Sequence, residues 1–281
     1  MTIVVGLTSG PRGGQGKTTL CVSLATLLSL HSPTLLIDIG GGATSIVQVS
    51  LPSQVITPPY VHDFVKWSSD GANVLDFICE RSLASLFGIV EESKKKRGFF
   101  RRKSKEDCVE KFKEKKLYLM PCPYGKPLKD VYLFVRKLPL LFPHFEIIII
   151  DFPAMAHIET WRSLIESLDL QMIVTLPEVA TLCDIMHGSI LTENTVFVVN
   201  RFIPCDEHVS VLNLIREYSR NIFVVPEDPY LSVFPNYGLY ALPRSSGKMK
   251  EVSLEDILKK KKCPSTAKAL YDIAFFILSR R

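Results

Sequence analysis

The stretch Gly10-Pro-Arg-Gly-Gly-Gln-Gly-Lys-Thr-Thr19 decides the fold of this 281-residue chain. An apolar run at residues 3–7 precedes it, and a run with helical character at residues 20–28 follows it. This order predicts a strand, a glycine-rich phosphate-binding loop and a helix, because glycines let several backbone N–H groups face one anion. The helix dipole adds positive potential at the same point. A glycine-rich turn without a ligand is the alternative interpretation.

Six further apolar runs alternate with segments of helical character. We expect strands near residues 2–8, 34–38, 117–120, 145–151, 170–176, 195–200 and 221–225. The run at 145–151 is rich in isoleucine throughout, which indicates burial on both faces at the centre of a parallel sheet. The sequence therefore predicts an α/β fold, a mostly parallel twisted sheet covered by helices on both faces. We expect one domain over residues 1–281, with a basic insertion at about 91–116 and a ligand at the carboxyl ends of the strands.

Other segments give weaker signals. Residues 51–70 are rich in proline and read as irregular, whereas residues 72–90 have helical spacing, with Leu75, Ile78 and Leu83 near one face. A helix is also expected over residues 128–141. The last helix, at 266–279, carries one apolar stripe. This stripe either packs on the core or lies on a membrane surface.

Two predicted strands end in a carboxylate. Asp38 ends the strand at 34–38, and Asp151 ends the strand at 145–151, where Phe152-Pro-Ala154 follows. An apolar strand that ends in aspartate is typical of the Walker B arrangement, in which the carboxylate holds a water of the Mg²⁺ shell. Lys17 would then reach the β- and γ-phosphates, and the Thr18 hydroxyl would ligate Mg²⁺. A purely structural carboxylate at the strand end is the alternative for both aspartates.

The loop departs from the common pattern G-x-x-x-x-G-K-[ST], because Pro11 stands at the first glycine. Its sequence Arg12-Gly-Gly-Gln-Gly-Lys-Thr18 resembles the deviant Walker A loop of the ParA/MinD ATPases, usually K-G-G-x-G-K-[ST]. The resemblance implies ATP and Mg²⁺ as cofactors, with Thr18 and Asp151 at the metal. It implies nucleotide binding by Gly13, Gly14, Gln15, Gly16, Lys17, Thr18 and Thr19. Arg12 stands at the signature lysine, which reaches the partner's phosphates across a nucleotide-bound dimer, and arginine is a bidentate phosphate donor.

The resemblance extends to the later strand ends. Asp151-Phe-Pro-Ala is similar to the family's D-x-P-x, and Asn200-Arg201 to its N-[RK] pair near the base. The amide of Asn200 offers the donor and acceptor that adenine requires, and a strand-ending turn is the alternative role. Pro226, with Glu227 and Asp228, is similar to the exit that lines the purine.

The residues implied in catalysis are Lys17, Arg12 and Asp38. Asp38 matches the first aspartate of the family's D-x-D, but Gly40 replaces the second, which helps to position the attacking water. The departure at Gly40 predicts weak Mg²⁺-dependent hydrolysis or none.

The net charge of +5 is concentrated in one segment. Residues 94–116 contain twelve Lys and Arg against four Asp and Glu, a local charge of +8, so the rest of the chain carries −3. Residues 94–105 also contain two phenylalanines, and such a run can bind nonspecific DNA or an acidic membrane surface. A solvated charged loop is the alternative.

These observations lead to two main hypotheses. The first is an ATP-dependent switch that forms a nucleotide-dependent homodimer and positions or partitions DNA or a cellular machine with an unidentified protein partner. The second is a hydrolysis-deficient scaffold or localisation protein. Iron–sulfur carriers with the same loop need a C-x-x-C pair, which the seven scattered cysteines do not provide, and a small-molecule kinase has no evident substrate site.

We expect a cytoplasmic protein that can associate with the nucleoid or with a membrane. The strand at the N-terminus leaves no secretory signal, and no apolar run reaches the roughly 18–20 residues of a membrane span.

Overall fold

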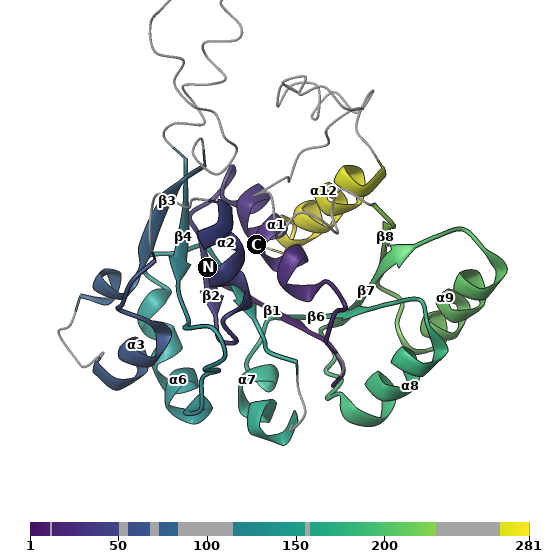
Figure 1. Cartoon of the computed structure of the whole chain (residues 1–281), viewed down its shortest axis with the longest axis horizontal. Helices are drawn as coiled ribbons and strands as arrows, with labels where there is room; N and C mark the ends of the chain where they lie inside the picture. Colours follow the sequence, from purple (N-terminus) through teal and green to yellow (C-terminus); the bar gives the residue numbers. More distant parts are fainter. Residues whose placement is uncertain are drawn as a thin grey trace, which may run out of the picture.

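The computed structural model describes residues 1–11, 13–50, 56–67, 73–83, 115–154, 158–228 and 265–280. Within them the chain forms one twisted sheet with helices on both faces (Figure 1). The predicted fold class is therefore confirmed. Most of the basic insertion, including residues 94–105, lies outside the described residues.

The sheet has eight strands among these residues, in the order β3-β4-β2-β5-β1-β6-β7-β8. All neighbours pair in parallel except β3 and β4. The strands are β1 (Ile3–Thr8), β2 (Thr34–Asp38), β3 (Cys79–Ser82), β4 (Lys116–Met120), β5 (Ile147–Asp151), β6 (Leu170–Thr175), β7 (Thr195–Phe202) and β8 (Ile222–Pro226). The seven strands expected from the apolar runs are present, with ends shifted by two residues at most.

Continuous apolar runs form the central strands because both faces of the sheet are covered there. In β5, Ile147 and Ile149 pack into one hydrophobic core, whereas Ile148 and Ile150 pack into the other. All four side chains are fully buried.

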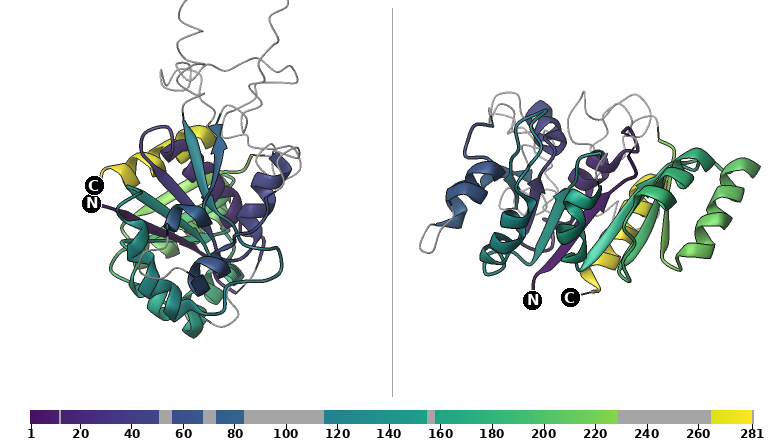
Figure 2. Two further views of the ribbon diagram at one scale, coloured as in Figure 1. Left: turned by 90° about the vertical axis from the view of Figure 1, so that its left-hand side faces the viewer. Right: turned by 90° about the horizontal axis from the view of Figure 1, so that it is seen from below.

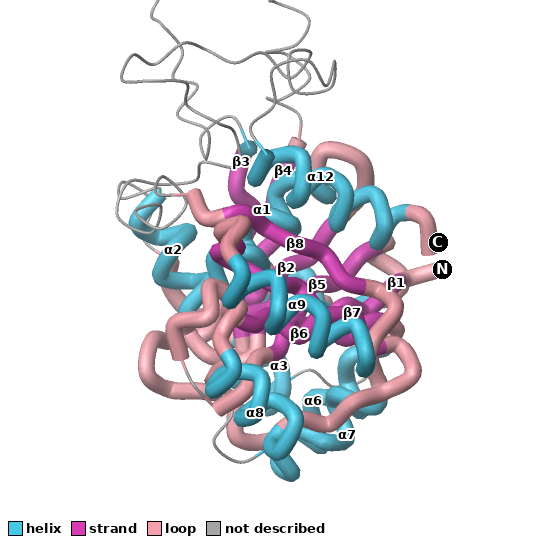
Figure 3. Tube along the Cα trace, turned by 90° about the vertical axis from the view of Figure 1, so that its right-hand side faces the viewer, coloured by secondary structure: helices cyan, strands magenta, loops and turns pink. Residues whose placement is uncertain are grey.

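The helices form two layers (Figures 2 and 3). One layer holds α1 (Lys17–Leu28), α2 (Gly42–Ser50) and α12 (Ser265–Leu278), whose described apolar residues share a core. The other layer holds α3 (Val61–Trp67), α6 (Val131–Lys137), α7 (Arg162–Glu166), α8 (Val179–Gly188) and α9 (Asp206–Tyr218). Short 3₁₀ helices, η1 (Val74–Phe77), η2 (Leu138–Leu141) and η3 (Ile158–Trp161), complete this layer. The predicted helix at 128–141 is thus α6 continued by η2.

The helix expected at residues 72–90 is wrong where the structure describes it. Residues 74–77 form η1, residues 79–82 form the edge strand β3, and Leu75 is 42% exposed. Pairing of β3 with β4, from Cys79↔Leu119 to Ser82↔Lys116, overrides the helical spacing. The irregular segment expected at 51–70 also contains a helix, α3, whose Val61, Phe64 and Val65 are buried.

The apolar stripe of α12 packs against the core. Leu270, Ala274 and Ile277 are at most 4% exposed and belong to the core shared with α1. The stripe is therefore covered by the protein itself. In the part of the chain that the structure describes, every helix is too short or too polar to cross a membrane.

Candidate nucleotide-binding site

The loop between β1 and α1 has the geometry of an anion-binding turn. Gly14 and Gly16 have φ of 82° and 85°, the left-handed conformation that glycine adopts without strain. Such turns direct successive N–H groups towards one point, here at the N-terminus of α1, which begins at Lys17. Gly13 and Gly14 are exposed, and a Cβ atom on either would have no neighbour within 4 Å. The outer side of the loop is therefore open to a ligand or a partner.

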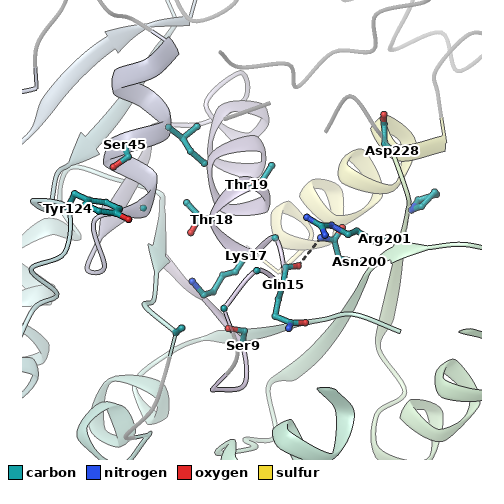
Figure 4. A pocket seen from close by; sticks show the side chains of 17 residues that line it. Ser9, Gln15, Lys17, Thr18, Thr19, Ser45, Tyr124, Asn200, Arg201 and Asp228 are labelled. Carbon is teal, nitrogen blue, oxygen red and sulfur yellow. Dashed lines mark hydrogen bonds between the residues drawn. The ribbon is translucent and has the colours of Figure 1, made fainter. Parts of the chain in front are cut away.

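Two side-chain hydrogen bonds fix the inner side of the loop. Gln15 is 4% exposed, and its Oε1 accepts a hydrogen bond of 2.9 Å from the N–H of Leu176, just after β6. The carbonyl oxygen of Gln15 accepts a second bond of 2.9 Å, from Asn200 Nδ2 at the end of β7 (Figure 4). The side chain of Gln15 thus faces the protein, and only its backbone can face a ligand.

Lys17, Thr18 and Asp151 form one polar cluster beneath the loop. Lys17 Nζ lies 3.3 Å from Asp151 Oδ1 and also donates to the carbonyl oxygen of Phe152. Thr18 Oγ1 donates to the same Asp151 oxygen over 3.3 Å. Because Lys17 is 8% and Asp151 1% exposed, the ammonium compensates a carboxylate that would otherwise be buried without a counter-charge.

Asp38 is a fully buried carboxylate that binds the loop after its own strand. Its Oδ1 accepts from the N–H groups of Gly40 and Gly41 at 2.9 and 2.6 Å, and its Oδ2 accepts from the N–H of Thr44 at 2.7 Å. Burial and the negative charge of Asp151 raise the pKa of Asp38 to about 6, against the effect of these bonds. Asp38 therefore shapes the start of α2.

Magnesium fits beside Thr18 and Asp151. A Cβ atom on Gly42 would lie 2.9 Å from Thr18 Oγ1 and 3.5 Å from Asp151 Oδ2, so the absence of a side chain there leaves space next to both oxygens. No group of three or more His, Cys, Asp or Glu among the described residues could hold a metal. One carboxylate and one hydroxyl suit Mg²⁺, which keeps several waters and takes its remaining ligands from phosphates.

A cavity of about 370 Å³ lies over this cluster at the carboxyl ends of the strands (Figure 4). Ten residues predicted for nucleotide binding line it: Gly13, Gly14, Gln15, Gly16, Lys17, Thr18, Thr19, Asn200, Arg201 and Pro226. Asp228 lines it as well. Asp38 and Asp151 lie outside the lining, Asp151 below Lys17 and Thr18. Arg12 is not among the residues that the structure describes.

The end of β7 supplies the second side of the cavity. Asn200 is 3% exposed, and its Oδ1 is buried without a hydrogen-bond partner in the structure. Arg201 has φ of 55°, rare for a residue with a side chain, at an irregularity in the pairing of β7 with β8. An acceptor that lacks a donor favours a ligand with N–H groups on this side.

The sequence missed the opposite end of the cavity. Ser45 and Tyr124 line this end, and Tyr124 is 83% exposed (Figure 4). Ser45 donates to the carbonyl oxygen of Gly41, at 2.8 Å. Tyr124 follows the end of β4 beside Gly125, whose φ is 71°. The rule that ligands lie at strand ends would have indicated this turn.

Comparisons with known proteins find solved structures with a similar fold. No family model and no curated protein sequence matches the chain. A Borrelia burgdorferi B31 structure, described as a plasmid partition protein bound to AMPPNP, has a TM-score of 0.60 and 16% identity, covering 100% of this chain and 99% of that one. An ATP complex of McdA(D38A) from Cyanothece has a TM-score of 0.62 and 17% identity over 99% and 96%. MinD of Aquifex aeolicus, in complex with MinC, has a TM-score of 0.57 and 18% identity over 99% and 96%.

The chain has a ParA/MinD-like fold. These structural neighbours include a plasmid partition protein and a cell division protein. Gly40 packs closely against the turn after β5. A Cβ atom on Gly40 would lie 3.1 Å from Pro153 Cα and 3.2 Å from Pro153 N, tighter than ordinary packing. The turn after β5 therefore lies where the side chain of a second aspartate would begin.

Proposed function

We propose that this protein is an ATP-dependent molecular switch of the ParA/MinD type. It binds Mg-ATP, forms a homodimer in that state, and returns to the monomer after slow hydrolysis. The observation that carries the proposal is the cavity at the strand ends, where the left-handed glycine loop, Lys17 and Thr18 meet the unpartnered oxygen of Asn200. Structural neighbours bound to AMPPNP and ATP support the same ligand class.

Each side of the cavity suits one part of ATP. The N–H groups of residues 13–19 and the ammonium of Lys17 would bind the phosphates. Thr18 would ligate Mg²⁺, and Asp151 would hold a water of its shell. Asn200, Arg201 and Pro226 would contact the adenine, because the free Asn200 Oδ1 can accept from the exocyclic amine.

Dimer formation would complete the phosphate site. Gly13 and Gly14 are exposed and have open space beside them, so the loop can face a second copy. Arg12 precedes these glycines in the sequence, and we propose that it reaches the phosphates bound by the partner.

Slow turnover follows from the residues at the phosphate end. Asp38 uses both oxygens to bind backbone N–H groups, and Gly40 has no side chain to orient a water. Catalysis would then rest on charge neutralisation by Lys17, Arg12 and Mg²⁺. The packing of Gly40 against Pro153 favours a second candidate function, a scaffold that binds ATP without hydrolysing it.

The dimer would act in the cytoplasm on a surface, either DNA or an acidic membrane, with a protein partner still to be identified. Residues 94–105 supply positive charge for either surface, and dimerisation doubles that charge. Replacing Arg97, Arg101, Arg102 and Lys103 with glutamate is expected to abolish surface binding and leave ATP binding intact. Survival of both DNA and liposome binding would refute the role of this segment.

Light scattering after size exclusion tests the switch, with Mg-ATP, Mg-ADP or no nucleotide and phosphate release followed in parallel. An ATP-only dimer with slow phosphate release is expected. Lys17→Ala should stay monomeric because it binds ATP more weakly, and Arg12→Ala should bind ATP as a monomer. A stable ATP dimer without turnover would establish the scaffold instead. A chain that binds no ATP would refute both functions.

A further inference from the structure

We infer that Gln15 is a positioning residue, whose side chain ties the phosphate-binding loop to the end of β6 and keeps the loop in the conformation that binds nucleotide. The hydrogen bond from the N–H of Leu176 to Gln15 Oε1 is called the latch below. The inference rests on the proposed nucleotide-binding function. It assigns to Gln15 an indirect role, because its amide points away from the cavity and acts on the loop backbone.

The first support is the contrast between Gln15 and its neighbours. Gly13 and Gly14 are exposed, whereas Gln15 is 4% exposed and extends into the protein. Its Oε1 meets the N–H of Leu176 at 2.9 Å. Leu176 lies one residue beyond the last β6–β7 pair, Thr175↔Val199. The glutamine thus satisfies the first backbone N–H after the end of β6.

The second support is that the same residue is held twice. While its side chain binds the end of β6, its carbonyl oxygen binds Asn200 Nδ2 at the end of β7. The carbonyl bond fixes the peptide plane between Gln15 and Gly16, and the side-chain bond holds Gln15 against the end of β6. Gln15 lies between Gly14 and Gly16, the two left-handed residues of the loop.

The latch matters because glycines leave the free loop many conformations. Glycine loses more conformational freedom on ordering than any other residue, so a loop released from one anchor must be ordered again by the nucleotide. A buried hydrogen bond of this type contributes about 1 kcal/mol. Its loss is expected to weaken nucleotide binding about five- to tenfold.

Gln15→Met and Gln15→Glu separate the latch from side-chain bulk. Methionine has nearly the same length and offers no oxygen acceptor, whereas glutamate keeps the acceptor and adds a negative charge. Without nucleotide, Gln15→Met is expected to speed hydrogen exchange of the Leu176 amide, measured by NMR, about five- to tenfold. Gln15→Glu is expected to keep that amide protected. In titrations with Mg-ATP, Gln15→Met is expected to show the five- to tenfold loss of affinity.

Thr195→Val is the control for general loosening. Thr195 Oγ1 accepts a bond of 2.8 Å from the N–H of Thr192, at the other end of β7, and donates a second bond of 2.8 Å to Gln171 Oε1 in β6. This variant loses two hydrogen bonds and is expected to lose at least as much stability as Gln15→Met, measured by urea unfolding. It is expected to keep wild-type affinity for Mg-ATP and wild-type exchange at Leu176.

The outcomes distinguish this inference from the proposed function. Wild-type protection of Leu176 in Gln15→Met would show that the latch is absent. Faster exchange with unchanged Mg-ATP affinity would show that the latch is structural and overturn the positioning role. A similar loss of affinity in Thr195→Val would also overturn it, since general loosening would then suffice. Absence of Mg-ATP binding in the wild type would instead refute the proposed function.

Discussion

Replacing Gly16 with alanine tests how the phosphate-binding loop is held. Gly14 and Gly16 share the left-handed conformation, with φ of 82° and 85°, so alanine at either position costs about 1–2 kcal/mol. Their surroundings differ. A Cβ atom on Gly14 would have no neighbour within 4 Å, whereas one on Gly16 would lie 2.2 Å from Asn200 Nδ2. Gly14→Ala is therefore a control for the backbone effect alone.

The expected loss of stability in Gly16→Ala follows from the hydrogen bond that Asn200 would lose. Its side chain is 3% exposed and donates to the Gln15 carbonyl at 2.9 Å, a bond that the new methyl group would break. The lost bond costs about 1 kcal/mol, and crowding in a packed site costs about 1–3 kcal/mol more. Gly16→Ala is thus expected to lower the free energy of unfolding by about 2–4 kcal/mol more than Gly14→Ala does.

Urea unfolding without nucleotide measures this difference. The double variant Gly16→Ala/Asn200→Ala removes the amide that collides with the methyl group. Its loss of stability is expected to fall short of the sum of the two single losses by at least about 1 kcal/mol. Equal losses in Gly14→Ala and Gly16→Ala, together with an additive double variant, would refute the view that Asn200 fixes the loop.

Three further substitutions test other parts of the structure. Lys17→Ala is expected to weaken Mg-ATP binding at least about thirtyfold in a fluorescent-nucleotide titration, because a buried ammonium is lost from the phosphate site; an unchanged affinity would contradict its role. Gly40→Asp is expected to lower the free energy of unfolding by about 1–3 kcal/mol by crowding Pro153, without faster phosphate release; rapid turnover would show that the site accepts the aspartate. In α12, Ile277→Ala is expected to lower the free energy of unfolding by about 2–5 kcal/mol, because Ile277 is buried. Phe275 is 68% exposed, so Phe275→Ala is expected to lower it by less than about 0.5 kcal/mol, and similar losses in the two variants would contradict the packing of α12.

The central strands were predictable because their signal is local. The run that forms β5 has four isoleucines before Asp151, and such a run is typical of the middle of a covered sheet. The glycine loop was predictable for a similar reason, since Gly14 and Gly16 need their left-handed conformation within the loop itself.

The edge of the sheet was not predictable from the same kind of signal. Strand β3 reads Cys-Glu-Arg-Ser and becomes a strand only because β4 lies beside it. The spacing of apolar residues over 72–90 favoured a helix, whereas the pairing with β4 makes this segment a strand. The site shows the same limit. The position of Tyr124 depends on which strand end lies next to the loop, and the sequence does not state that order.

Gln15 illustrates a further limit. Its place in a loop that resembles that of the ParA/MinD ATPases predicted contact with the nucleotide, and Gln15 does line the cavity. The direction of its side chain depends on Leu176, which is 161 residues later in the chain. No pattern within the loop indicates that partner.

The two carboxylates at the strand ends have different roles because they have different hydrogen-bond partners. Asp38 and Asp151 are directly paired in register on β2 and β5, and both are almost fully buried. Two such charges repel each other unless each is compensated. Lys17 compensates Asp151 and thereby ties the carboxylate to the phosphate site. Backbone N–H groups hold Asp38 and thereby place Gly42, without a side chain, next to Thr18.

This division bears on turnover. A carboxylate whose oxygens already accept three N–H groups is poorly placed to take a proton from water as well. At position 40, the closeness of Pro153 leaves little room for a replacement. Asp228, the carboxylate that lines the cavity, lies on the side of Asn200 and away from Thr18 (Figure 4). We therefore propose that the output of the protein depends on nucleotide occupancy more than on the rate of hydrolysis.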